Sequence, residues 1–192
     1  SESAASSNSG SGAAAISNVF AIDLGMFFGA VAETTPTGSV RLLTSVREES
    51  ASFRMAVASE NDQLFFGSQA MERRLGKTQN LAYCVPMYIG KDVVEREIAG
   101  RQCPPEVLMA MIFRDLIANA WTEDEPPAVT AITIPASYDQ LHRQSILQAA
   151  EMAGLRSVRL VHRSIAAVQS TLLGGEYEEL DDPPASVEEA QE

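Results

Sequence analysis

The chain has 192 residues, a formal net charge of −12 and an apolar fraction of 45%. This length and composition are typical of one globular domain with a packed core. The acidic balance and the lack of any Lys/Arg cluster argue against a nucleic-acid partner. No apolar run is long enough to span a bilayer, so we expect no membrane partner either.

The two ends of the chain differ from its middle. Residues 1–18 are nearly all Ser, Ala, Gly and Asn, a composition that predicts a flexible arm. Residues 174–192 carry eight of the 26 acidic residues, no Lys or Arg, and Pro183-Pro184, which predicts an acidic disordered tail. Without that tail, 18 acids face 14 bases, so the expected folded domain, 19–173, is only mildly acidic.

Cysteine and histidine usage gives no metal pattern. Cys84 and Cys103 are 19 positions apart, which favours free thiols in a reducing, cytoplasmic compartment; a disulfide or metal role is the alternative. His142 and His162 pair with no Cys or Asp at a ligand spacing. We therefore expect no metal site.

The first half of the domain reads mainly as strands, separated by turn residues. The predicted strands are 19–22, 28–34, 40–46, 53–58 and 63–66, with turns at 36–39 and 61–62. A short helix is predicted over 69–75, ending near Gly76.

The second half alternates helices and strands. A long helix is predicted over 105–121, with its apolar face formed by Leu108, Met111, Ile112, Leu116 and Ala120. A strand at 129–134, a helix capped by Asp139 and stopped at Gly154, and a strand at 158–161 form a βαβ unit. A last helix is predicted over 164–173. The expected fold is α/β, a mixed sheet with flanking helices.

The first strand ends in Asp23-Leu24-Gly25. A glycine in such a turn lets backbone amides approach a phosphate, and an Asp at a strand end can hold a metal through water. The same triplet is also typical of an ordinary turn with a capping Asp.

Several segments, in order, resemble the N-terminal part (lobe I) of the ATPase domain of the 70-kDa heat-shock protein (DnaK) chaperone family, in the actin-like ATPase superfamily. Bacterial actin-like filament proteins are the nearest competing relatives. The similar segments are Ala21 to Gly25, Gly67 to Gly90, Ile132 to Ala136, His142 to Gln144, Ala153 to Leu155 and Ala166-Ala167.

The resemblance implies a ribonuclease-H-like lobe and, for an intact site, ATP or ADP with Mg as ligand. No second Asp-Leu-Gly-Gly-Gly occurs before the tail, so the second lobe is not expected here. The short stretch between Gly90 and Pro104 implies a reduced subdomain IB, with a hairpin over 93–98.

The chain departs from the family at the positions that carry its chemistry. The two threonines of the phosphate loop are replaced by Met26 and Phe27, the catalytic Lys by Pro86, and the catalytic Glu by Arg163. We therefore expect a degraded phosphate loop at Asp23, Gly25, Met26 and Phe27, and no catalytic residue. For Asp23 two interpretations stay open: a residual role in binding Mg or nucleotide, or only the capping of the turn at the strand end.

Pro135 and Arg143 keep family positions that relay nucleotide state between domains. The simpler interpretation is a strand-end proline and a surface arginine. The Met26-Phe27-Phe28 cluster is predicted as an interface, a self-plug or core filling.

Three functions stay open. The first is a non-hydrolysing, chaperone-related protein-interaction module, with a protein partner or self-association through an exposed lobe face. The second is a fragment of an ATP-dependent chaperone whose second lobe lies elsewhere. The third is an actin-like scaffold or filament protein.

Overall fold

The computed structural model describes residues 19–35, 39–44, 50–73, 80–94, 96–121 and 127–172. The expected arm and acidic tail lie outside these residues, as do positions 36–38 of the predicted turn and the end of the short helix expected at 69–75. Within this part of the chain, no helix has both the length and the apolar character needed to cross a membrane.

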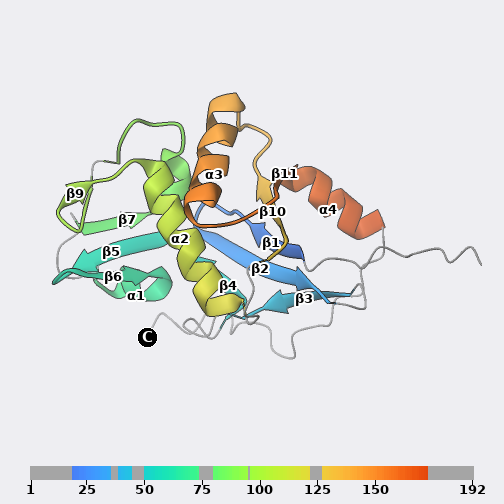
Figure 1. Cartoon of the computed structure of the whole chain (residues 1–192), viewed down its shortest axis with the longest axis horizontal. Coiled ribbons are helices and arrows are strands. Elements are labelled where there is room, and N and C mark those ends of the chain that lie inside the picture. The colour runs from blue at the N-terminus through green and yellow to red at the C-terminus, as the bar shows by residue number, and fades with distance from the viewer. Residues whose placement is uncertain are drawn as a thin grey trace, which may run out of the picture.

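The main sheet is mixed, as the sequence predicts. Its central strand β1 (Val19–Asp23) pairs antiparallel with β2 (Phe28–Thr34) on one side and parallel with β10 (Val129–Ile134) on the other. Five of its six strands follow the order β11-β10-β1-β2-β3, where β3 is Val40–Leu43 and β11 is Val158–His162, and the sixth also pairs with β2. Figure 1 shows the N-terminal strands and β10 side by side, although about 100 residues separate them in sequence.

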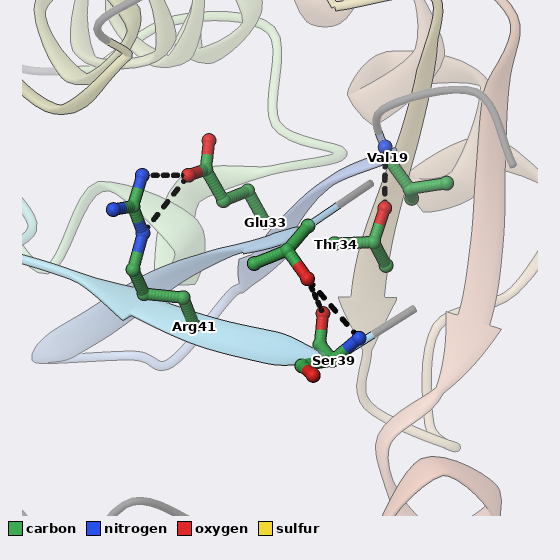
Figure 2. Close-up of polar contacts among 6 residues, drawn as sticks. Val19, Glu33, Thr34, Ser39 and Arg41 are labelled. Carbon is green, nitrogen blue, oxygen red and sulfur yellow. Dashed lines mark hydrogen bonds and ion pairs between the residues drawn. The ribbon is translucent and has the colours of Figure 1, made fainter. Parts of the chain in front are cut away.

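Burial alternates along these strands with the period of two that a pleated sheet requires. In β10, Thr130, Ile132 and Ile134 are buried and the residues between them are half-buried. In β2 the alternation buries Glu33, which lies directly opposite Arg41 on β3 and pairs with its guanidinium (Figure 2). The ion pair explains how a carboxylate is tolerated in this row.

A second sheet has the order β6-β5-β7, formed by β6 (Gln63–Phe66), β5 (Ala56–Glu60) and β7 (Leu81–Tyr83). The prediction of one strand over 53–58 was wrong, because the chain changes sheets at Met55. The three residues before Met55 form β4 (Ser52–Arg54), which pairs with β2 of the main sheet. The Met55 amide itself donates to the Phe27 carbonyl at 2.9 Å. The predicted turn at 61–62 is present, with positive φ at both residues.

Helices α2 (Pro105–Ala120) and α3 (Gln140–Met152) pack against each other and on the sheets. Four of the five residues predicted for the apolar face of α2 are buried, and Met111 is half-buried. The α3 helix begins as expected, since the Asp139 carboxylate accepts the His142 amide at 3.1 Å. It is followed by Gly154 at φ +87°, a conformation that favours glycine.

Three short elements differ from the sequence expectation. The hairpin predicted over 93–98 instead consists of β8 (Glu97–Ile98) and β9 (Arg101–Gln102), because Ala99 and Gly100 adopt the positive φ of its turn. The short helix α1 (Gly67–Glu72) begins two residues earlier than predicted. A 3-10 turn, η3 (Val85–Tyr88), was not predicted.

The last described helix, α4 (Arg163–Leu172), has no buried residue. It follows β11 directly and projects from the edge of the sheet in Figure 1. Three apolar side chains, Ile165, Val168 and Leu172, are exposed along it at helical spacing.

Candidate functional site

The turn between β1 and β2 is closed tightly around Gly25. Its amide donates to the Asp23 carbonyl at 3.2 Å. A Cβ at this position would lie 1.8 Å from the carbonyl oxygen of Phe28, which is far inside van der Waals contact. Glycine is therefore required here by the close approach of the backbone.

Asp23 is held by two groups on the neighbouring strand and helix. Its Oδ1 accepts the Thr133 hydroxyl from β10 and the Arg163 Nε from the start of α4, the latter at 3.0 Å. The Thr133 hydroxyl also accepts the Leu24 amide at 3.1 Å. Thr133 was missed by sequence reasoning, although parallel pairing of β1 with β10 places it beside Asp23.

Arg163 lies over the glycine turn. Its Nη2 is 3.6 Å from the place that a Cβ on Gly25 would occupy. The side chains of Arg163 and Asp23 are 44% and 49% exposed, so water and salt screen their attraction. A metal ion at Asp23 would have to share or displace this guanidinium.

The Met26-Phe27-Phe28 segment does not fill the core. Its side chains are 48%, 59% and 48% exposed, which excludes the core-filling interpretation for them. Phe27 and Phe28 line a hollow of about 60 Å³ together with Arg54, Met55, Ala56, Met71, Tyr83 and Cys84. The Arg54 guanidinium lies 4.8 Å from the centre of the Phe28 ring.

Pro86 is a buried residue of η3. Its carbonyl accepts the Tyr138 hydroxyl at 2.9 Å. Burial raises the pKa of Tyr138, and the positive charge of Arg163 partly opposes that rise. Tyr138 is a second residue that sequence reasoning missed.

His142 lies beside Tyr138, the residue that bonds to Pro86 of η3. Its ring stacks on Tyr138 with centroids 4.8 Å apart, and its Nδ1 lies 2.7 Å from Oδ1 of Asp139. The hydrogen bonds from His142 lower the pKa of the Asp139 carboxyl. Gly90, at φ +83°, lies close enough that a Cβ there would be 3.2 Å from the His142 Nε2.

The other two residues singled out from the sequence, Pro135 and Arg143, bond to groups other than Asp23 and Arg163. The carbonyl of Pro135 accepts the Tyr138 amide at 3.2 Å. Arg143 Nη2 donates to His162 Nε2 at 2.7 Å, which places the imidazole proton on Nδ1. That Nδ1 is buried without a hydrogen-bond partner among the described residues.

The cysteines are both free thiols, and burial raises the pKa of each. In the part of the chain that the structure describes, no group of three or more His, Cys, Asp or Glu side chains is placed to hold a metal.

The fold and this turn define an α/β protein with a tight glycine turn after its first strand. The family model described as "Hsp70 protein" matches residues 64–170, which is more than half of the chain. The chain therefore belongs to the Hsp70 family. The match includes Pro86, Pro135, Arg143 and Arg163, whereas the turn at Asp23 to Phe28 precedes it.

Two curated relatives agree with this family assignment. Chaperone protein DnaK 3 of Synechococcus sp. is 27% identical over 138 residues, covering 60% of this chain and 21% of the relative. Chaperone protein DnaK of Thermus thermophilus is 30% identical over 118 residues, covering 59% of this chain and 19% of the relative. The chain thus spans about a fifth of the length of these curated relatives.

Proposed function

We propose that this chain is the first, ribonuclease-H-like lobe of an Hsp70-type ATPase domain with a degraded nucleotide site, and that it acts as a non-hydrolysing protein-interaction module. The observation that carries the proposal is the contact of Arg163 with Asp23 across Gly25. An antiparallel meander followed by two parallel strands supports the lobe assignment. The two-residue strands β8 and β9 support a reduced subdomain IB.

The loss of hydrolysis follows from electrostatics. Phosphoryl transfer depends on positioning and on charges aimed at the transferred group and its metal. Here the one carboxylate of the turn is already engaged by a cation, and Arg163 cannot accept a proton from water. The Pro86 position offers only a carbonyl, which Tyr138 already occupies.

The proposed role in binding another protein is supported by apolar side chains that are exposed to water. Met26, Phe27 and Phe28 follow the turn and face water, where a nucleotide-binding loop would need small or hydroxyl side chains. Adjacent exposed side chains of this size mark protein-interaction sites. Pro135 and Arg143 stay candidates for relaying contacts to a further domain, and the free thiols fit a reducing compartment.

Calorimetric titration with Mg-ATP and Mg-ADP tests the proposal, using the whole chain and the Asp23→Ala variant. We expect no saturable heat up to millimolar nucleotide and no phosphate release from either protein. Binding that disappears in Asp23→Ala would contradict the degraded site. Arg163→Glu is the informative companion, because it removes the cation from Asp23 and offers a second carboxylate to Mg²⁺; we expect Mg²⁺ to raise its Tm and not that of the unmodified chain.

The second candidate function is a segment of an ATP-dependent chaperone whose other lobe completes the site. The observation in its favour is that the chain spans only about a fifth of its DnaK relatives. Nucleotide binding that appears only when a second lobe is added to the titration would support this function over the first.

A further inference from the structure

We propose that the acidic segment 176–182 of this chain docks onto the exposed patch formed by Met26, Phe27, Phe28 and Tyr83, here called the Phe27 patch. This inference rests on the proposed function in one respect: the Phe27 patch is the surface given there to a protein partner.

The patch itself is apolar and open. Tyr83 is 45% exposed, so all four of its side chains keep about half of their surface in water. Phe27, Phe28 and Tyr83 share the lining of one small hollow. Covering these side chains would be favourable by roughly 25 cal/mol for each Å² removed from water.

Two guanidinium groups lie at the rim of the patch, and one of them, Arg163, also pairs with the Asp23 carboxylate. Arg54 lies over the Phe28 ring, and Arg163 lies over the turn that leads into Met26. A second copy of this chain, docked patch to patch, would bring two such rims together, which like-charge repulsion disfavours. The rim favours an occupant that combines apolar side chains with carboxylates.

Segment 176–182 has that composition. It reads Glu-Tyr-Glu-Glu-Leu-Asp-Asp, with two apolar side chains, Tyr177 and Leu180, among five acidic ones. Its flanks from 174 to 192 contain no Lys or Arg that the arginine rim would repel. Tyr177 and Leu180 supply apolar anchors, and the carboxylates match Arg54 and Arg163.

The segment is also long enough to reach. The ten residues of α4 span about 15 Å from Arg163 to Leu172. The five residues from Leu172 to Tyr177 span up to about 17 Å when extended, and the eight to Leu180 up to about 27 Å. Tyr177 can therefore return to the start of α4, and Leu180 can reach beyond it to the patch.

Disulfide trapping in the full-length chain tests the proposal. In a background with Cys84→Ser and Cys103→Ser, one variant carries Met26→Cys with Asp181→Cys, which keeps both phenylalanines and both tail anchors. The matched control carries Leu64→Cys with Asp181→Cys, since Leu64 is also exposed but lies on β6 of the other sheet. Circular dichroism confirms that the variants fold alike, and peptide mass mapping locates the bonds.

We expect the Met26 pair to close within one molecule at least about ten times faster than the control, because docking raises the local concentration above that of a free tether. Adding Tyr177→Ser and Leu180→Ser should reduce the rate to that of the control, and 1 M salt should slow it. Equal rates for the two pairs, no effect of the anchor substitutions, or bonds that form only between molecules would each overturn the proposal. None of these outcomes depends on nucleotide, so a failure here is distinguishable from ATP hydrolysis, which would overturn the proposed function instead.

Discussion

The Nε of Arg163 lies 3.0 Å from Oδ1 of Asp23, across 140 positions of sequence. The contact joins the end of the first strand to the first residue of the last described helix. It places a guanidinium over the glycine turn, where the resemblance described under Sequence analysis predicts a carboxylate. Arg163 thereby brings a positive charge to the turn and gives Asp23 an internal partner.

The Asp23–Arg163 pair should contribute little to stability. Both side chains are about half exposed, and exposed ion pairs are worth about 0–1 kcal/mol. A double-mutant cycle of Asp23→Ala and Arg163→Ala, measured by urea unfolding, should give a coupling energy below about 1 kcal/mol that shrinks in high salt. Asp23→Ala alone should cost more than Arg163→Ala, since it also removes the acceptor for Thr133. A coupling that salt does not weaken would show that the pair is shielded from water.

Gly25→Ala should open the turn. The added methyl would collide with the Phe28 carbonyl, and crowding of this kind costs about 1–3 kcal/mol. Gly100→Ala is the matched control, because its Cβ would meet nothing within 4 Å and only its positive φ is unfavourable. Urea unfolding of both variants separates collision from backbone strain. If Gly25→Ala proved the milder of the two, the turn would be more adaptable than its geometry indicates.

The sequence predicted the parts of the fold that local patterns determine. The strand at 129–134, the Asp139 cap and Gly154 are all present, because alternation and capping act over a few residues. The change of sheets at Met55 was missed, since it depends on a backbone bond to Phe27, 28 positions away. The prediction placed the hairpin at 93–98 instead of 97–102, because its Ala99-Gly100 turn is a weaker sequence signal for a hairpin than Asn-Gly.

The site was predictable only in part. Asp23 and Gly25 are visible as a strand-end motif, but nothing local to Arg163 connects it to them. Its relevance came from a resemblance, and only the structure shows the contact. Tyr138 could not be identified, because its hydroxyl bond to Pro86 depends on how two turns distant in sequence pack together.

Asp139 gives a pH-dependent contribution to stability. Its pKa is lowered from the ordinary 3.8, chiefly by the hydrogen bond from the His142 side chain, so its contribution is complete above that value and is lost as pH falls through the lowered one. Asp139→Ala should lower the Tm at neutral pH, and the difference from the unmodified chain should narrow from about pH 5 to about pH 3. Asp139→Asn keeps an N-cap acceptor without the charge, so it should recover part of the loss. A difference in Tm that is independent of pH would mean that the cap acts without its charge.

Tyr138→Phe should destabilise the chain near neutral pH and less at high pH. The variant loses the hydroxyl bond to Pro86, which costs about 0.5–1.5 kcal/mol. Burial raises the pKa of Tyr138 above the ordinary 10.0, and only the neutral phenol can donate. The contribution is therefore complete below pH 10 and is lost as pH rises through the folded-state pKa.

Urea unfolding from pH 8 to 11 checks this, with Tyr83→Phe as the control because Tyr83 is exposed. The free-energy deficit of Tyr138→Phe should stay constant up to about pH 10 and then shrink, whereas Tyr83→Phe should differ little from the unmodified chain throughout. Because the charge of Arg163 limits the rise in the Tyr138 pKa, Arg163→Ala should raise the pH at which Tyr138 ionises in the folded chain, followed by the tyrosinate absorbance that Tyr138→Phe removes. The onset of the shrinkage should stay where it is, because the unfolded-state pKa sets it. A folded-state ionisation of Tyr138 unchanged by Arg163→Ala would show that the guanidinium acts on Asp23 and not on Tyr138.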